Sequence, residues 1–133
     1  MEIVAANAGL LAQAARTFMN ADADSGYLET PGTLAFVATT ADEITGWCWG
    51  YRLPRPDGAS MLYLHQLEVV ESHRGQGIGR ALTSAFMAAG RSAGATKMFL
   101  TTGAGNAPAR ALYESLGAGL AAQGPTVNYW MPL

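Results

Sequence analysis

Hydrophobic residues recur along the first half of the chain with two different periods. Between Leu10 and Met19 they stand three and four positions apart, which predicts an amphipathic helix, and Asn7 is placed to cap it. The short run Glu2–Val4 before this helix is expected to be a strand. Three later runs are rich in apolar, β-branched and aromatic residues and predict further strands: 33–39, 44–53 and 61–70.

The period changes again at Gly77, where a helical pattern begins. Apolar residues continue at helical spacing to Ala89, and Gly90 or Gly94 is expected to end the helix. The remaining predicted elements are a strand at Met98–Leu100, a helix at Ala107–Leu116 capped by Asn106 and stopped by Gly117, and a strand at Val127–Met131. This order of elements predicts an α/β (α+β) fold, a mixed β-sheet flanked by helices, in a single domain over residues 1–133.

Composition and charge exclude several classes of protein. Of the 133 residues, 50% are hydrophobic and 14% are charged, which fits a chain with one compact core. A formal net charge of −2 provides no basic field, so nucleic acid is not an expected partner. Cys48 is the only cysteine, so we expect neither a disulfide framework nor a cysteine-based metal site. The sequence shows neither a bilayer-spanning apolar stretch nor a secretory signal, so we expect a cytoplasmic location away from membranes.

The segment from Leu67 to Arg80 carries the clearest chemical signal. An apolar strand passes through a short polar link into three glycines, Gly75, Gly77 and Gly79, that open a helix. Glycines let the backbone turn sharply and approach a ligand, and the first N–H groups of a helix favour a bound anion. A phosphate or pyrophosphate is therefore the expected ligand, although glycines also serve close packing of a strand on a helix.

Spacing excludes two common nucleotide-binding loops. A Walker A loop ends in Gly-Lys-Ser/Thr, and here Gly79 is followed by Arg80 and Ala81. A dinucleotide fingerprint needs G-x-G-x-x-G, whereas the three glycines of this chain stand at alternate positions. The loop therefore belongs to neither class.

Two motifs resemble the signatures of the GNAT superfamily of N-acetyltransferases. The run Arg74-Gly75-Gln76-Gly77-Ile78-Gly79 matches the acetyl-CoA loop, Gln/Arg-x-x-Gly-x-Gly/Ala, and follows the hydrophobic strand Leu67-Glu68-Val69. The run Asn106-x-x-Ala109-x-x-Leu112-Tyr113-x-x-x-Gly117 resembles the second signature, except that Ala118 stands in place of the usual final Phe. Both motifs occur in the order typical of the family.

Within the superfamily, the chain is most similar to the aminoglycoside 3-N-acetyltransferase type I group. That similarity rests on Tyr51-Arg52-Leu53-Pro54-Arg55-Pro56, Tyr63, Leu67 and His73-Arg74. The group has an Asp where this chain has Gln66. The antibiotic substrate of the group is therefore not carried over with the similarity.

The resemblance implies a twisted sheet in which two central parallel strands splay apart and admit acetyl-CoA, the acetyl donor. The pantetheine arm would pair with the strand at 67–69, and backbone N–H groups from Gln76 to Arg80 would hold the pyrophosphate. Arg74 would add positive charge beside the pyrophosphate. The cofactor-binding residues implied are Leu67, Glu68, Val69, Arg74, Gly75, Gln76, Gly77, Ile78, Gly79, Arg80, Asn106 and Ala109, and no metal is implied.

The implied reaction needs groups that move protons. An amine is mostly a cation at neutral pH, so a base must remove a proton before attack on the thioester, and the leaving thiolate gains from protonation. Tyr113 stands at the general-acid position of the family, with a core aromatic as its alternative role. His65 is the first candidate base, with a hydrogen-bonded core histidine as the alternative. Glu68 is the second candidate, and alternation places it on the opposite face from His65 unless a bulge intervenes. The backbone N–H of Val69 would stabilise the oxyanion.

The sequence specifies the acceptor less closely than the donor. One strand face carries three aromatic residues, typical of a core but also suited to an acceptor pocket: Trp47, Trp49 and Tyr51. A polar stretch carries an acidic cluster, typical of a solvated loop but also suited to attract a polycation: Asp22, Asp24 and Glu29.

We therefore predict an acetyl-CoA-dependent N-acetyltransferase acting on a primary amine of a small molecule, with aminoglycoside-like compounds and polyamines as candidates. Transfer to an amino group of a peptide or protein is one alternative, and a non-catalytic acyl-CoA sensor is another. The oligomeric state stays open, with a homodimer as one option.

Overall fold

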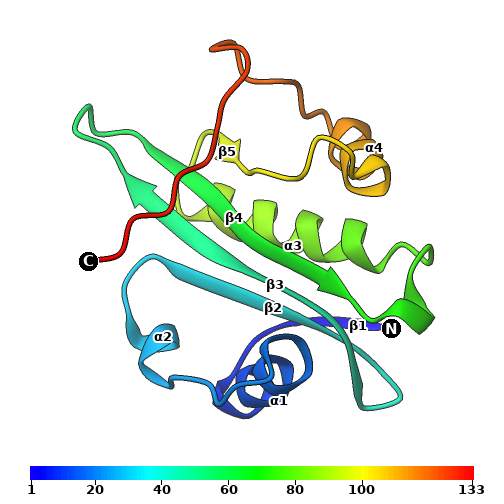
Figure 1. The fold of residues 1–133 in the computed structure, drawn as a ribbon. Helices are drawn as coiled ribbons and strands as arrows, with labels where there is room; N and C mark the ends of the chain where they lie inside the picture. The colour runs from blue at the N-terminus through cyan, green and yellow to red at the C-terminus, as the bar shows by residue number, and fades with distance from the viewer. The chain divides into compact units, whose positions relative to one another are not determined.

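The computed structural model describes residues 1–133 and comprises two units, Met1–Thr101 and Thr102–Leu133, which are described separately (Figure 1). The first unit holds a five-stranded sheet: β1 (Glu2–Ala5), β2 (Thr33–Thr40), β3 (Glu43–Pro54), β4 (Ser60–Val69) and β5 (Met98–Phe99). Its helices are α1 (Ala8–Met19), α2 (Gly26–Glu29), the 3-10 helix η1 (Glu71–His73) and α3 (Ile78–Ser92). The second unit holds α4 (Ala107–Ser115).

The sheet has the order β1-β2-β3-β4-β5, and β4 has an incomplete set of partners. The first four strands pair antiparallel, whereas β4 pairs parallel with β5 at two positions, Leu62 with Met98 and Tyr63 with Phe99. From there to Val69, β4 remains paired with β3 but has no ladder partner on its β5 side. The predicted divergence of two parallel strands is confirmed, although β5 forms the edge of this sheet rather than its centre.

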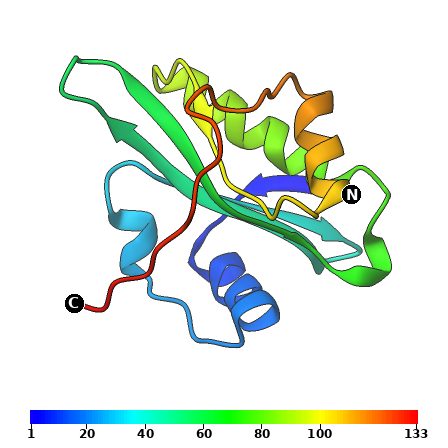
Figure 2. The same ribbon diagram turned by 45° about the horizontal axis from the view of Figure 1, so that its top comes forward.

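Helices cover both faces of the sheet: α1 and α2 lie on one side, and α3 lies on the other (Figures 1 and 2). The α3 side of β3 is formed by small residues, which allows a close approach. A Cβ atom built on Gly46 would lie 3.0 Å from Leu82 Cδ1. A Cβ on Gly50 would clash with the Tyr63 carbonyl oxygen and lie 2.9 Å from Phe86 Cζ. The alternation predicted for this strand is therefore confirmed, with the glycines facing α3.

The opposite face of β3 carries the aromatic residues and packs under α1. Trp47 is buried in one cluster with Leu11, Ala14 and Ala35, and its ring stacks on Phe18 at a centroid separation of 5.6 Å. Leu11, Ala14 and Phe18 recur along α1 with helical spacing, so one stripe of the helix covers the sheet.

Two predicted helix ends compare differently with the structure. Asn7 caps α1 as predicted, because its side chain accepts a hydrogen bond from the Leu10 N–H at 2.9 Å. Of the two glycines predicted to end α3, Gly94 is confirmed and Gly90 is not. The helix continues to Ser92, Ala93 is its C-cap, and Gly94 follows with a φ of +95°. A Cβ atom on Gly90 would clash with the Leu62 side chain, so this glycine serves the packing of α3 on β4.

The predicted strand at Val127–Met131 is wrong, since these residues adopt no regular structure. Their apolar side chains are exposed, as Trp130 shows with 96% relative exposure, so alternation alone did not bring them into a sheet. The short helix α2 was not predicted, because four residues are too few to show a helical period. None of the helices combines the length and the apolar character needed to span a membrane.

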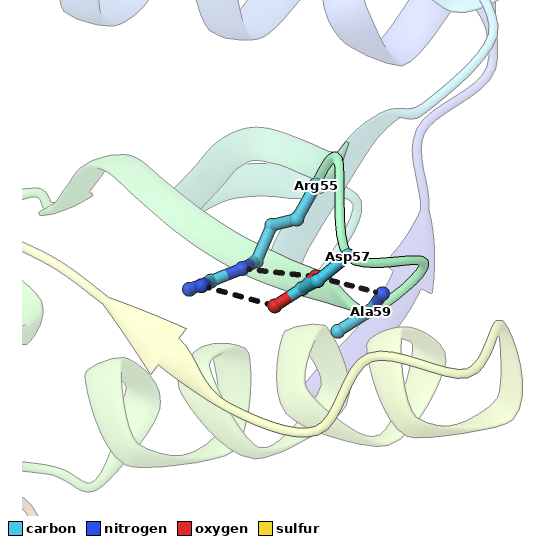
Figure 3. A network of polar contacts seen from close by, with 3 residues as sticks. All are labelled: Arg55, Asp57 and Ala59. Atoms are coloured by element: carbon cyan, nitrogen blue, oxygen red, sulfur yellow. Dashed lines mark hydrogen bonds and ion pairs between the residues drawn. The ribbon is translucent and has the colours of Figure 1, made fainter.

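A compact turn joins β3 to β4 and sets their register (Figure 3). The Asp57 carboxylate accepts a hydrogen bond from the Ala59 N–H at 3.0 Å and pairs with the Arg55 guanidinium, where Nη2 and Oδ2 lie 3.2 Å apart. The Ala59 N–H, together with Arg55, lowers the pKa of the exposed Asp57 carboxyl from its ordinary value. The turn is completed by Gly58, whose φ of +84° favours glycine.

We expect Gly50→Ala to destabilise the fold by about 1–3 kcal/mol, because the new methyl group overpacks the contact between β3, β4 and α3. Thermal unfolding followed by circular dichroism measures this as a lower Tm. Gly103→Ala is the control, because its Cβ would meet nothing within 4 Å. Equal Tm values for the two variants would contradict the close packing of α3.

Candidate active site

A β-bulge in β4 determines which side chains share its aromatic face. Trp49 lies opposite Gln66 and Gly50 lies opposite Leu64, so His65 is the extra residue of the bulge. A bulge places two consecutive residues on one side and resets the alternation beyond it. Glu68, which pairs with Trp47, therefore comes to the same face as His65. The sequence analysis placed Glu68 on the opposite face from His65 unless a bulge intervened. The bulge is present, so the two residues share a face.

His65 lies among aromatic rings and is exposed to solvent. Its ring centroid is 4.3 Å from that of Trp49, 5.2 Å from that of Tyr63 and 6.2 Å from that of Tyr51. Three aromatic rings therefore surround the imidazole on the open side of β4. The alternative role of a buried core histidine is excluded by this exposure.

Glu68 is linked to the aromatic face by a chain of two hydrogen bonds through Gln66. The Trp49 Nε1–H donates to Gln66 Oε1 at 2.8 Å, and the Gln66 Nε2–H donates to Glu68 Oε1 at 2.7 Å. All three side chains are half-buried. The sequence did not single out Gln66, because its two hydrogen bonds depend on how β4 pairs with β3.

The glycine loop connects β4 to α3. Gly75 and Gly77 have φ values of +74° and +84°, and Cβ atoms built on them would meet nothing within 4 Å. Helix α3 has no side-chain cap and no acidic residue in its first turn. The Arg74 Nε–H donates to the Val69 carbonyl oxygen at 3.0 Å, which holds the guanidinium at the end of β4. A helix N-terminus with open space and an adjacent cation suits a phosphate group.

A cavity of about 220 Å³ lies between α1, α2 and the aromatic face of β3. Its walls are mostly apolar and aromatic, with two carboxylates: Leu11, Ala15, Met19, Asp22, Ala23, Asp24, Tyr27, Trp47, Trp49 and Tyr51. The structure thus brings two of the acidic residues together with the three aromatic ones, whereas Glu29 does not line the cavity. Trp47 is 2% exposed and its Nε1–H has no hydrogen-bond partner.

Tyr27 joins α2 to the sheet and forms part of the cavity wall. Its hydroxyl lies 2.9 Å from the carbonyl oxygens of both Leu34 and Gly50. Burial raises the pKa of the Tyr27 phenol above its ordinary value, so the group stays protonated and donates. The sequence did not identify this residue, because α2 was not predicted.

The three remaining candidates lie on α4 in the second unit. The Asn106 side chain caps this helix by accepting a hydrogen bond from the Ala109 N–H at 3.2 Å, as predicted. Tyr113 follows Ala109 by four positions and is half-buried. Residues three and four apart share one helix face, so Asn106, Ala109 and Tyr113 line up along α4.

Neither cysteine nor clustered metal ligands contribute to the site. Cys48 is fully buried against α3, and this burial raises the pKa of its thiol to about 12. The thiol therefore stays protonated and acts as a small core residue. No group of three or more His, Cys, Asp or Glu side chains is placed to hold a metal ion.

Comparisons with known proteins agree with this geometry. The sequence matches the acetyltransferase (GNAT) family over residues 10–118. N-acetyltransferase 8 of Rattus norvegicus is 35% identical over 98 residues, which cover 73% of this chain and 44% of that protein. The chain therefore spans less than half the length of this relative.

Two solved structures share the fold. An aminoglycoside acetyltransferase from an uncultured soil metagenomic sample, in complex with sisomicin, has a TM-score of 0.83 at 20% identity, with 99% of this chain and 95% of that chain covered. An aminoglycoside N-acetyltransferase in complex with CoA has a TM-score of 0.80 at 16% identity, with 99% and 100% covered. The family match contains both the glycine loop and the α4 motif, and the chain belongs to the acetyltransferase (GNAT) family, whose enzymes use acetyl-CoA as the acetyl donor.

Proposed function

We propose that the chain is an acetyl-CoA-dependent N-acetyltransferase that acetylates a primary amine of a small cationic molecule. The observation that carries the proposal is the continuous path from the unpaired edge of β4 into the glycine loop and the uncapped N-terminus of α3. This path offers main-chain hydrogen bonds to an extended chain and, directly after it, a site for phosphates. Pantetheine and pyrophosphate are joined in that order in acetyl-CoA.

The proposed donor site uses the backbone more than side chains. The edge of β4 from Leu67 to Val69 pairs with the amides of the pantetheine arm, and the N–H groups from Gln76 to Arg80 bind the pyrophosphate. Arg74 adds positive charge, because its guanidinium is held beside Val69. Asn106 contacts the pantetheine region and Ala109 leaves room for it.

The proposed reaction moves one acetyl group and takes two protons from the acceptor nitrogen. The ammonium loses the first proton before the attack and the second as the amide forms, and this second proton replaces the one that Tyr113 gives to the sulfur. The amine attacks the thioester carbonyl carbon of acetyl-CoA, and coenzyme A departs as the free thiol. His65 or Glu68 takes a proton from the acceptor ammonium, which frees the nitrogen lone pair for the new N–C bond. The Val69 N–H donates to the carbonyl oxygen as negative charge develops there. Tyr113 gives a proton to the sulfur as the C–S bond breaks, because a phenol keeps its proton at neutral pH whereas a carboxylic acid does not.

The cavity supports a small cationic acceptor. Its volume of about 220 Å³ is below the range of about 300–1,000 Å³ typical of drug-sized ligands, so it suits one ring or one alkyl chain rather than a folded peptide segment. Aromatic walls attract an ammonium group, and Asp22 and Asp24 add two negative charges.

Thiol release from acetyl-CoA tests the proposed function with a panel of aminoglycosides, polyamines, amino acids and peptides. We expect turnover with a small cationic amine, and mass spectrometry of the product should show one added acetyl group. The position of the acetyl group on an acetylated aminoglycoside would test the similarity to the 3-N-acetyltransferase type I group, since that group acetylates the 3-amino group. Acetyl-CoA binding without turnover on any amine would instead support the acyl-CoA sensor.

We expect Gly77→Asp to abolish acetyl-CoA binding while the protein stays folded. The carboxylate would enter the open space at the N-terminus of α3 and repel the pyrophosphate. Gly58→Asp is a matched control, because Gly58 has the same φ of +84° and equally open surroundings in the β3–β4 turn. Calorimetry should show lost affinity in the first variant alone, and wild-type affinity in Gly77→Asp would remove the phosphate site.

We expect Tyr113→Phe to lower kcat by about 100-fold with little change in acetyl-CoA affinity. The substitution keeps the ring and deletes the proton donor, and general acid catalysis typically contributes about 10²–10⁴-fold. Steady-state kinetics and calorimetry separate the two effects. A loss confined to affinity or Tm would make Tyr113 a structural aromatic.

We expect the double variant Asp22→Asn, Asp24→Asn to raise KM for a cationic acceptor by about three- to tenfold, since each exposed ion pair contributes up to about 1 kcal/mol. The effect should shrink at high ionic strength, while kcat stays the same. Asp42→Asn, an exposed aspartate in the β2–β3 turn, is the control. An unchanged KM would place the acceptor outside the cavity.

A further inference from the structure

Gln66 stands in the middle of a polar chain that leads from the cavity to Glu68. The Trp49 indole donates to its amide oxygen at 2.8 Å, and its amide nitrogen donates to Glu68 Oε1 at 2.7 Å. Trp49 also lines the cavity and lies against the His65 ring at a centroid separation of 4.3 Å. Gln66 therefore joins one wall of the cavity to a carboxylate on the same face of the sheet.

The direction of both hydrogen bonds follows from the chemistry of the partners. An indole nitrogen only donates, so the amide oxygen of Gln66 has to face Trp49. The amide NH₂ then faces Glu68, whose carboxylate supplies the acceptor oxygen. Neither a carboxylate nor an aliphatic side chain at position 66 could make both bonds, because the first lacks an N–H donor and the second lacks both groups.

We propose that Gln66 is a positioning residue for acetyl transfer, which holds the Glu68 carboxylate in the orientation in which it takes a proton from the acceptor amine. The inference rests on the proposed acetyltransferase function. The proton moves from the ammonium nitrogen to a Glu68 oxygen, and the lone pair left on nitrogen forms the bond to the acetyl carbon. Because one Glu68 oxygen accepts from Gln66, the second oxygen receives the proton.

A double-mutant cycle tests whether Gln66 acts through Glu68. Gln66→Met keeps the length of the side chain and deletes both hydrogen bonds, so kcat should fall about tenfold or more, as expected for a lost bond to a charged group. KM for acetyl-CoA should not change. In the Glu68→Gln background, Gln66→Met should cost less than about twofold. Gln13→Met, at an exposed position of α1, is the matched control and should keep the wild-type kcat.

A spectroscopic measurement tests the polar chain independently of activity. The indole N–H signal of Trp49, assigned by its loss in Trp49→Phe, should exchange slowly with solvent in the wild type and faster in Gln66→Met. An unchanged circular dichroism spectrum and Tm in Gln66→Met exclude a folding defect as the cause of a lower kcat. If no amine is acetylated, the proposed function fails, while the exchange rates still report on the polar chain.

Three results would overturn the positioning role of Gln66. The first is a wild-type kcat in Glu68→Gln, because Gln66 would then have no catalytic group to act through. The second is an equal loss from Gln66→Met in both backgrounds, which would show that the two residues act separately. The third is an unchanged exchange rate of the Trp49 indole in Gln66→Met, which would show that the hydrogen bond is absent in solution.

Discussion

The close contact of α3 with the sheet is the constraint on which the other features of the first unit depend. It requires positions without a Cβ atom on both partners, namely Gly46 and Gly50 on β3 and Gly90 on α3. Leu82 and Phe86 fill the space between them and are fully buried. A helix held at this distance cannot shift along the sheet without a clash, so its first turn is fixed beside the end of β4. The position of the glycine loop is therefore a consequence of core packing.

The two edges of β4 differ in how far they are paired with a neighbouring strand. On one side β4 pairs with β3 along its length, and on the other it meets β5 at two positions and stays open up to Val69. Unpaired N–H and C=O groups at a strand edge are a ready template for an added extended chain. In a protein without such a ligand the same edge would be a liability. The open edge leads directly into the glycine loop, and the proposed donor site rests on this continuity.

The sequence predicted the elements well where the local pattern was strong and where a cap or turn residue marked an end. Asn7 and Asn106 cap helices as predicted, and the period of two in β3 separated Trp47 from Gly46 correctly. It failed where the tertiary contact decides the outcome. Gly90 lies inside α3 because Leu62 occupies the space of its Cβ, which no local pattern reveals.

In the candidate site, too, the sequence predicted the features that depend on local spacing and missed those that depend on tertiary contacts. The glycine loop and the α4 motif could be read from spacing, whereas the bulge at His65 could not, since a bulge depends on how two strands pair. The common face of His65 and Glu68 and the two hydrogen bonds of Gln66 depend on this bulge, so they could not be predicted either. The exposed run at 127–131 shows the converse case, in which a strand-like pattern does not form a strand.

The departure of this chain from the aminoglycoside 3-N-acetyltransferase type I pattern at Gln66 has a physical meaning in this structure. An Asp at that position would be one methylene shorter, would have no N–H for Glu68 and would place a like charge beside it. It would also leave the Trp49 indole to pair with a carboxylate instead of an amide oxygen. With Gln66, the negative charges on this face lie at Asp22 and Asp24 on the cavity wall and at Glu68 beyond Trp49. Relative to an Asp, Gln66 therefore removes one negative charge beside Glu68 and supplies the N–H that the Glu68 carboxylate accepts.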